Sequence, residues 1–108
     1  MDQDERQWGN FRVIDRGPAF TVKRLTVKPG GRLSLQHHLH RSEHWTVAAG
    51  TAEVTRNDEV FRLTLGESCD IPLGARHRLA NPGDEDLIII EVWFGADTSE
   101  DDIVRHPD

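Results

Sequence analysis

The chain has 108 residues, of which 36% are hydrophobic and 30% are charged, a balance typical of one folded domain and not of a disordered or fibrous chain. Its formal net charge of -6 provides no broad positive field for a polyanion, so we expect neither nucleic acid nor an anionic membrane surface as a partner. Cys69 is the single cysteine, which excludes an internal disulfide and a metal site built from several cysteines.

The first residues are charged where a signal peptide would be apolar, and the longest aliphatic run, 87–90, is far shorter than a membrane-spanning helix. Together with the lone cysteine, these features predict a soluble cytoplasmic protein. We expect a single domain over residues 1–108, with its core at about 8–95 and a C-terminal tail at 96–108.

Short segments rich in Val, Ile, Leu, Thr and Phe follow one another along the chain, separated by turn-forming Gly, Pro, Asn and Asp. They predict strands at residues 11–15, 20–27, 33–38, 43–49, 51–55, 59–65, 68–71, 77–80 and 87–94. Many short, closely spaced strands favour an all-β fold, either a closed barrel or a double-sheet jelly roll. After residue 94 two alternatives stay open: a short terminal helix capped by Ser99, or a polar tail.

Histidines cluster in the strand-rich region. Four of the 6 lie between residues 37 and 44, and His77 lies far away in sequence. Alternate side chains of a strand share a face, so Gln36, His38 and His40 can point the same way. Glu43 and His77 can complete the group, giving the mixed nitrogen and oxygen donors that suit a divalent metal ion.

We therefore expect one divalent metal ion, held by Gln36, His38, Glu43 and His77, with His40 as the alternative to Gln36. Zinc is the first expectation, and iron, manganese, cobalt or nickel are alternatives. Three or four protein ligands leave a coordination position open, which catalysis requires.

The segment 87–94 is apolar at both strand parities, so we expect the barrel core to cover one face and a second sheet or a partner subunit to cover the other. A homodimer is the default expectation. Glu91 interrupts this run. A carboxylate buried there is either paired in a salt bridge or has a raised pKa, which would make it a candidate base.

Two spaced motifs carry a resemblance to a known family. They read Gly30-x5-Gln36-x-His38-x4-Glu43-x6-Gly50 and Gly66-x5-Pro72-x-Gly74-x2-His77-x3-Asn81. They resemble the two motifs of the cupin superfamily, with glutamine in place of the first motif's leading histidine. More narrowly, segments such as Arg41-Ser-Glu-His-Trp45 and Glu100-Asp-Asp-Ile-Val-Arg105 look like the type II mannose-6-phosphate isomerase domain. The chain departs from that family at residues 37–40 and after Phe94.

The resemblance implies a cupin double-stranded β-helix (jelly-roll) barrel and a metal-dependent isomerase that interconverts mannose 6-phosphate and fructose 6-phosphate. In that family the domain often follows a guanylyltransferase domain, which this sequence does not contain. Proton transfer needs a base, and the candidates are, in order, His40, Glu91 and Lys23. The sugar phosphate needs cations at the mouth of the barrel, for which we expect Arg24, Arg32, Arg78 and Arg105.

Two other functions are compatible with the same residues. One is a non-catalytic cupin that binds a sugar or another metabolite as a sensor or accessory subunit. The other is an iron(II) dioxygenase, because a fold does not fix a reaction.

Overall fold

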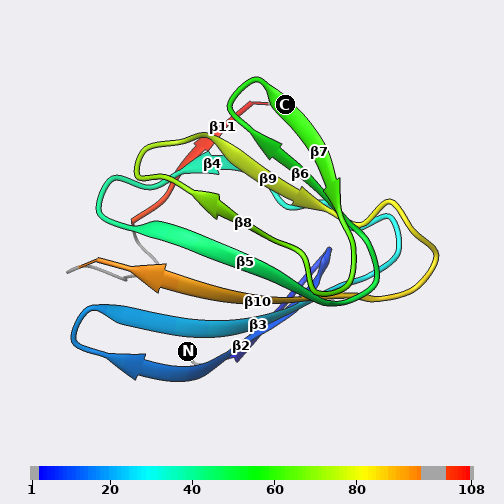
Figure 1. Ribbon diagram of the computed structural model, residues 1–108, viewed down its shortest axis with the longest axis horizontal. Helices are drawn as coiled ribbons and strands as arrows, with labels where there is room; N and C mark the ends of the chain where they lie inside the picture. Colours follow the sequence, from blue (N-terminus) through cyan, green and yellow to red (C-terminus); the bar gives the residue numbers. More distant parts are fainter. Residues whose placement is uncertain (1–2, 96–101, 108) are drawn as a thin grey trace.

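The computed structural model describes residues 3–95 and 102–107, and all regular structure in these ranges is β-strand. The strands are β1 (Gln3–Arg6), β2 (Gly9–Gly17), β3 (Phe20–Val27), β4 (Leu35–His37), β5 (Ser42–Ala49), β6 (Ala52–Arg56), β7 (Glu59–Leu63), β8 (Ser68–Ile71), β9 (His77–Ala80), β10 (Leu87–Phe94) and β11 (Val104–His106). They form two sheets, with strand orders β1-β2-β3-β10-β5-β8 and β11-β4-β9-β6-β7. The two sheets converge at one end of the barrel and are open at the other (Figure 1).

The all-β prediction is confirmed, and each predicted strand is present with small shifts of its bounds. Two strands were not predicted. The segment of β1 is entirely polar and is held by its hairpin with β2, whereas β11 pairs with β4 and so belongs to the second sheet. Of the two alternatives left open after residue 94, the helix capped by Ser99 would begin outside the described residues, and residues 102–107 contain no helix.

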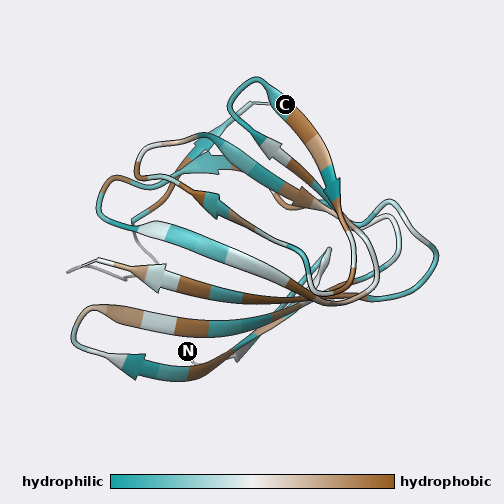
Figure 2. Ribbon diagram, viewed as in Figure 1, coloured by the Kyte–Doolittle hydropathy of each residue, from teal (hydrophilic) through white to brown (hydrophobic). Residues whose placement is uncertain are grey.

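The interior of the barrel divides into an apolar half and a polar half. Along β10 the inward side chains are first Leu87 and Ile89, then Glu91 and Trp93, and all four are buried. The inward face of the neighbouring strand β3 changes from apolar to polar at the same level, because the register places Lys23 opposite Glu91. The apolar half contains Leu25, Val27, Val47, Val54, Leu63, Leu79, Leu87 and Ile89. Figure 2 shows the change most plainly on β10, whose ribbon is most hydrophobic toward the convergent end of the sheets.

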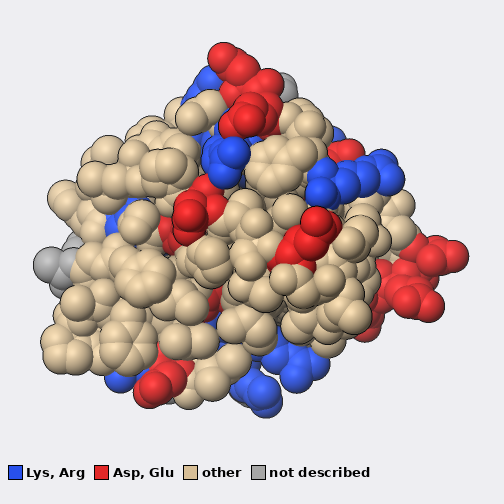
Figure 3. All heavy atoms as spheres, viewed as in Figure 1, with Lys and Arg blue, Asp and Glu red and all other residues tan. Residues whose placement is uncertain are grey.

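The outer face of β10 is apolar as well. Ile88, Ile90 and Val92 are half-buried, and Phe94 is 49% exposed. The homodimer expected at this face stays a prediction. On the face drawn in Figure 3, acidic side chains gather at the β9–β10 loop and at the β6–β7 turn, while Lys and Arg side chains form separate small groups.

None of the described residues belongs to a helix that could cross a membrane.

Candidate metal centre

A cavity of about 160 Å³ lies in the polar half of the barrel. Both sheets and the C-terminal segment contribute to its walls. Its charged, amide, hydroxyl and imidazole side chains are Arg6, Lys23, Ser34, Gln36, His38, Arg41, Glu43, His77, Arg78, Glu91 and Arg105. The remaining lining residues are apolar or aromatic, so several charged and polar groups converge between apolar walls.

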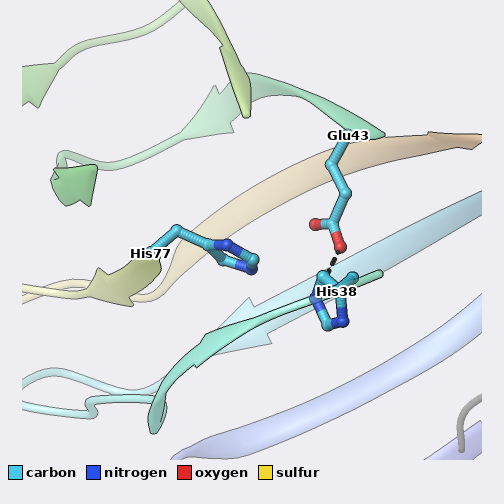
Figure 4. A group of neighbouring side chains, drawn as sticks. All are labelled: His38, Glu43 and His77. Atoms are coloured by element: carbon cyan, nitrogen blue, oxygen red, sulfur yellow. Dashed lines mark ion pairs between the residues drawn. The ribbon is translucent and has the colours of Figure 1, made fainter. Parts of the chain in front are cut away.

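Three of the predicted ligands converge on this cavity (Figure 4). His38 follows β4, Glu43 lies on β5 and His77 opens β9, and all three are buried. One ligand atom from each residue lies within 4.8 Å of the other two. Nε2 of His38 is 3.0 Å from Oε2 of Glu43. This spacing lets one ion contact all three side chains after small adjustments.

A turn joins the two distant parts of the site. Gly74 has a positive φ of 79°, which glycine adopts without steric cost. Its N–H donates to the carbonyl oxygen of His38 at 3.0 Å. The turn that precedes His77 is therefore tied to the segment that carries His38, which explains why two histidines far apart in sequence lie together.

Backbone carbonyl groups fix the orientation of both imidazoles. Nδ1 of His77 donates to the carbonyl oxygen of Ala75 at 3.0 Å, and Nδ1 of His38 donates to the carbonyl oxygen of Asp102. Nε2 is then the ligand atom of each ring, an arrangement common among metal-binding histidines. Burial lowers the pKa of His77 and favours its neutral, ligating form.

Glu43 is a buried carboxylate surrounded by donors. Trp45 donates from Nε1 to Oε1 at 2.8 Å, and Arg41 donates from Nε to Oε2 at 3.0 Å. Burial alone would raise the pKa of Glu43, but the hydrogen bond with His38 and the charges of His77 and Arg41 lower it overall. Glu43 is therefore ionised, the state in which a carboxylate binds a cation.

Glu91 has the opposite character. Burial, followed by the negative charge of Glu43, raises the pKa of Glu91 to about 8, although Lys23 and a hydrogen bond from Trp93 act against the rise. Nε1 of Trp93 donates to Oε1 of Glu91 at 3.0 Å. Nζ of Lys23 lies 4.1 Å from the ring centroid of Phe11 and 3.9 Å from that of Trp93. Both Glu91 and Lys23, predicted as candidate bases, thus line the cavity.

Gln36 lines the cavity and is the cross-strand partner of His77. Its amide nitrogen donates to the carbonyl and hydroxyl oxygens of Ser34, at 3.2 Å each. Its role as a ligand stays a prediction. His40 does not join the group, because β4 ends at His37 and the strand alternation used to place His40 does not reach it. Its side chain is exposed, and its backbone N–H donates to Oδ2 of Asp102 at 2.9 Å.

The four predicted phosphate-binding arginines divide into two pairs. Arg78 and Arg105 line the cavity. Arg24 does not, because it lies between the inward residues of β3 and faces the outer surface, where it borders a second depression with Arg12. Arg32 is exposed, forms an isolated β-bridge with Ala80 before β4 begins, and is also absent from the described lining. The expectation that Arg24 lines the mouth was therefore wrong. Burial, followed by the positive charge of Arg32, lowers the pKa of Arg78, so Arg32 lies near that guanidinium, and its predicted place at the mouth stays a prediction.

Arg41 and Asp102, which contact the proposed ligand His38, were not predicted as site residues. Arg41 has the same strand parity as Glu43 and Trp45, a signal that could have placed it inward. Asp102 accepts hydrogen bonds from the backbone N–H groups of Leu39 and His40, both at 2.9 Å. No local pattern predicts such a contact, since 62 or 63 residues separate the partners.

Comparison with solved structures defines the class of fold. The cupin domain of Schizosaccharomyces pombe Cnp3 superposes with a TM-score of 0.79 at 19% sequence identity, over 85% of this chain and 68% of that one. The two antiparallel sheets and the cavity between them are therefore those of a cupin double-stranded β-helix.

Sequence comparison is more specific. The family described as Mannose-6-phosphate isomerase C-terminal matches residues 2–108, and the chain belongs to this family. The xanthan biosynthesis protein XanB of Xanthomonas campestris pv. campestris is 59% identical over 95% of this chain and 22% of its own length. The alginate biosynthesis protein AlgA of Pseudomonas aeruginosa is 54% identical over 95% of this chain and 21% of its own length. The chain thus spans about a fifth of the length of these curated relatives.

The donor set fits a divalent metal ion. Two imidazole nitrogens and one ionised carboxylate oxygen converge, and the other nitrogen of each ring is already engaged by a carbonyl oxygen. Zinc, iron(II), manganese, cobalt and nickel all accept such donors.

Proposed function

We propose that this chain binds one divalent metal ion through His38, Glu43 and His77, and that it interconverts mannose 6-phosphate and fructose 6-phosphate. Gln36 is the candidate fourth ligand. Family membership supports the choice of substrate. The observation that carries the proposal is the convergence of three buried donors on a polar cavity that also contains a protonatable carboxyl group. The names of XanB and AlgA support a role in supplying sugar for polysaccharide synthesis.

Glu91 is the residue best suited to move the proton in this reaction. An aldose and its ketose differ by a proton transferred between neighbouring carbons, so one group must accept the proton and return it. A bound metal ion would stabilise the negative charge that develops on the sugar oxygens. With a pKa of about 8, Glu91 can both accept and release a proton near neutral pH. Lys23 holds a positive charge beside it, and His40 is no longer a candidate because it lies outside the cavity lining.

Arg78 and Arg105 are the candidates for binding the phosphate. The chain carries a net charge of -6, so an anionic substrate requires a local group of cations. Arg105 is the cross-strand partner of Gln36, which is in turn the partner of His77. This row of three residues places a guanidinium two strands away from a proposed metal ligand.

The function is tested by an assay of hexose phosphate conversion under anaerobic conditions. We expect the zinc-loaded chain to form fructose 6-phosphate from mannose 6-phosphate, and we expect chelation to abolish this activity until zinc is restored. Metal and sugar binding without turnover would instead support a sensor or accessory cupin. Activity that strictly requires oxygen would support the dioxygenase.

A pair of arginine variants tests the binding of phosphate. Arg105→Gln removes a cation from the cavity, whereas Arg24→Gln removes one from the outer surface and serves as the matched control. We expect Arg105→Gln to raise KM for the sugar phosphate about tenfold or more, as loss of a charge-assisted hydrogen bond does, with a smaller effect on kcat. Equal KM values in the two variants would contradict a role for Arg105.

A further inference from the structure

Arg41 occupies the candidate metal centre although its side chain is not a metal ligand. Its Nε lies 3.0 Å from Oε2 of Glu43, and its Nη2 lies 3.1 Å from Nε2 of His38. The guanidinium carbon is 3.4 Å from the ring centroid of Trp93, and the residue is only 5% exposed. Arg41 therefore contacts atoms of two of the three side chains that would hold the ion.

The local sequence and a distant contact explain why Arg41 lies there. It directly precedes β5 and has the inward parity of Glu43. The two preceding backbone N–H groups, of Leu39 and His40, are held by the carboxylate of Asp102. The segment that carries Arg41 is therefore anchored, and its side chain is buried against Glu43, His38 and Trp93.

A guanidinium and a divalent metal ion would bind the same atoms of this site. Arginine stays charged in proteins, and a buried charge requires a partner. Glu43 is that partner for Arg41, and the face of Trp93 adds a cation–π contact. A metal ion would need the same carboxylate oxygen and the same imidazole nitrogen. Two cations a few ångströms apart in a buried site also repel each other strongly.

We propose, building on the metal centre proposed above, that Arg41 competes with the metal ion for Oε2 of Glu43 and Nε2 of His38. Metal uptake then displaces the guanidinium from both atoms, while Trp93 retains it at the wall of the cavity. In the metal-free protein Arg41 keeps the buried Glu43 paired. It therefore stabilises the fold and, by the same contacts, lowers the affinity for metal.

The test is a calorimetric titration of Co²⁺ into the metal-free chain and three variants. Arg41→Met keeps an unbranched, largely apolar side chain without the charge or the donors. Arg41→Lys keeps the charge without the two-point contact. Arg62→Met is the matched control, because Arg62 is 63% exposed on β7 and its loss changes the net charge by the same amount.

We expect Arg41→Met to bind Co²⁺ about tenfold more tightly than the wild type, or more tightly still. Arg41→Lys should be intermediate, and Arg62→Met should be unchanged. Without metal, Arg41→Met should unfold at a lower temperature than the wild type, because the buried carboxylate of Glu43 loses the guanidinium that pairs with it. Its gain in Tm on adding Co²⁺ should be larger than that of the wild type.

Equal or weaker Co²⁺ binding by Arg41→Met would overturn the proposal. The proposal would also be overturned if Arg41→Met bound Co²⁺ more tightly while Arg41→Lys bound it with wild-type affinity. Repulsion between the two positive charges would then be enough to explain the effect, without competition for the two ligand atoms. If Arg41→Met does not fold, the lysine variant decides, because competition predicts tighter binding there too. If the wild-type chain binds no Co²⁺, the proposed metal centre itself is contradicted. If the wild type binds Co²⁺ and neither Arg41 variant binds it more tightly, only the proposed role of Arg41 is contradicted.

Discussion

Two glutamates in one cavity have opposite acid–base character. Each accepts an indole N–H from the tryptophan two residues further along its strand, Trp45 for Glu43 and Trp93 for Glu91. The indole bonds therefore do not explain the difference. Glu43 also contacts Arg41, and the effect of burial on the pKa of Glu43 is outweighed by the hydrogen bond with His38 and the charges of His77 and Arg41, whereas burial dominates at Glu91. One carboxylate is thus kept ionised for a cation, and the other can exchange a proton.

Replacing Glu91 by glutamine should change how stability depends on pH. In the folded chain the pKa of Glu91 is about 8, against an ordinary value of 4.5. Between these values the unfolded chain releases a proton that the folded chain keeps, so Glu91 makes the wild type less stable as pH rises through this window. The effect is on the order of a few kcal/mol. Glu91→Gln should lack this loss and should also lower isomerase activity by about a hundredfold or more.

Urea unfolding at a series of pH values from 5 to 8.5 measures the first effect in the metal-free proteins, and the steady-state assay measures the second. A free energy of unfolding that changes with pH in parallel for wild type and Glu91→Gln would show that Glu91 titrates normally. Glu91→Asp, which keeps the carboxyl group, is the matched control for activity.

At the scale of elements, the C-terminal segment completes the site. Asp102 holds the segment after β4 through the N–H groups of Leu39 and His40, and its own carbonyl oxygen orients His38. The following residues line the cavity and form β11, which pairs with β4. A part of the chain that reads as a polar tail therefore positions a proposed ligand from more than half the sequence away.

Asp102→Ala should destabilise the fold by about 2 kcal/mol, because two partly buried backbone N–H groups lose their acceptor. Asp102→Asn, which keeps one acceptor oxygen, should lose less. Urea unfolding measures the change, and amide hydrogen exchange at Leu39 and His40 shows whether the lost protection is local. Wild-type stability in Asp102→Ala would mean that these two bonds do not hold the segment.

Strand alternation predicted much of the site but could not predict all of it. It placed Gln36 and His38 on one face, and the two spaced motifs added Glu43 and His77; all four line the cavity. Alternation failed for His40, where the strand had already ended. Arg24 was chosen for its charge, although its strand parity faces outward. Asp102 depends on tertiary contacts that no local pattern contains. The fold itself was predictable because the strands alternate with strong turn signals.

At the scale of the whole molecule, the residues that stabilise the fold and the residues proposed to carry the chemistry lie in different halves of the barrel. The convergent end buries a continuous aliphatic cluster, and a buried aliphatic side chain contributes about 1.5–3 kcal/mol of transfer free energy. This cluster offsets the cost of burying charged groups such as Lys23, Arg41 and Glu43 in the other half. Strands from both sheets reach the cavity, so the site forms only when the whole barrel closes.

The metal content of the purified chain tests the central claim most directly. Wild type, His77→Ala and His44→Ala are loaded with Zn²⁺, dialysed, and measured by elemental analysis. His44 is the matched control, because it lies on the outer face and pairs with Asp70 at 2.6 Å. The convergence of His38, Glu43 and His77 predicts about one bound ion per chain for wild type and His44→Ala and almost none for His77→Ala. Full metal content in His77→Ala would contradict this ligand set.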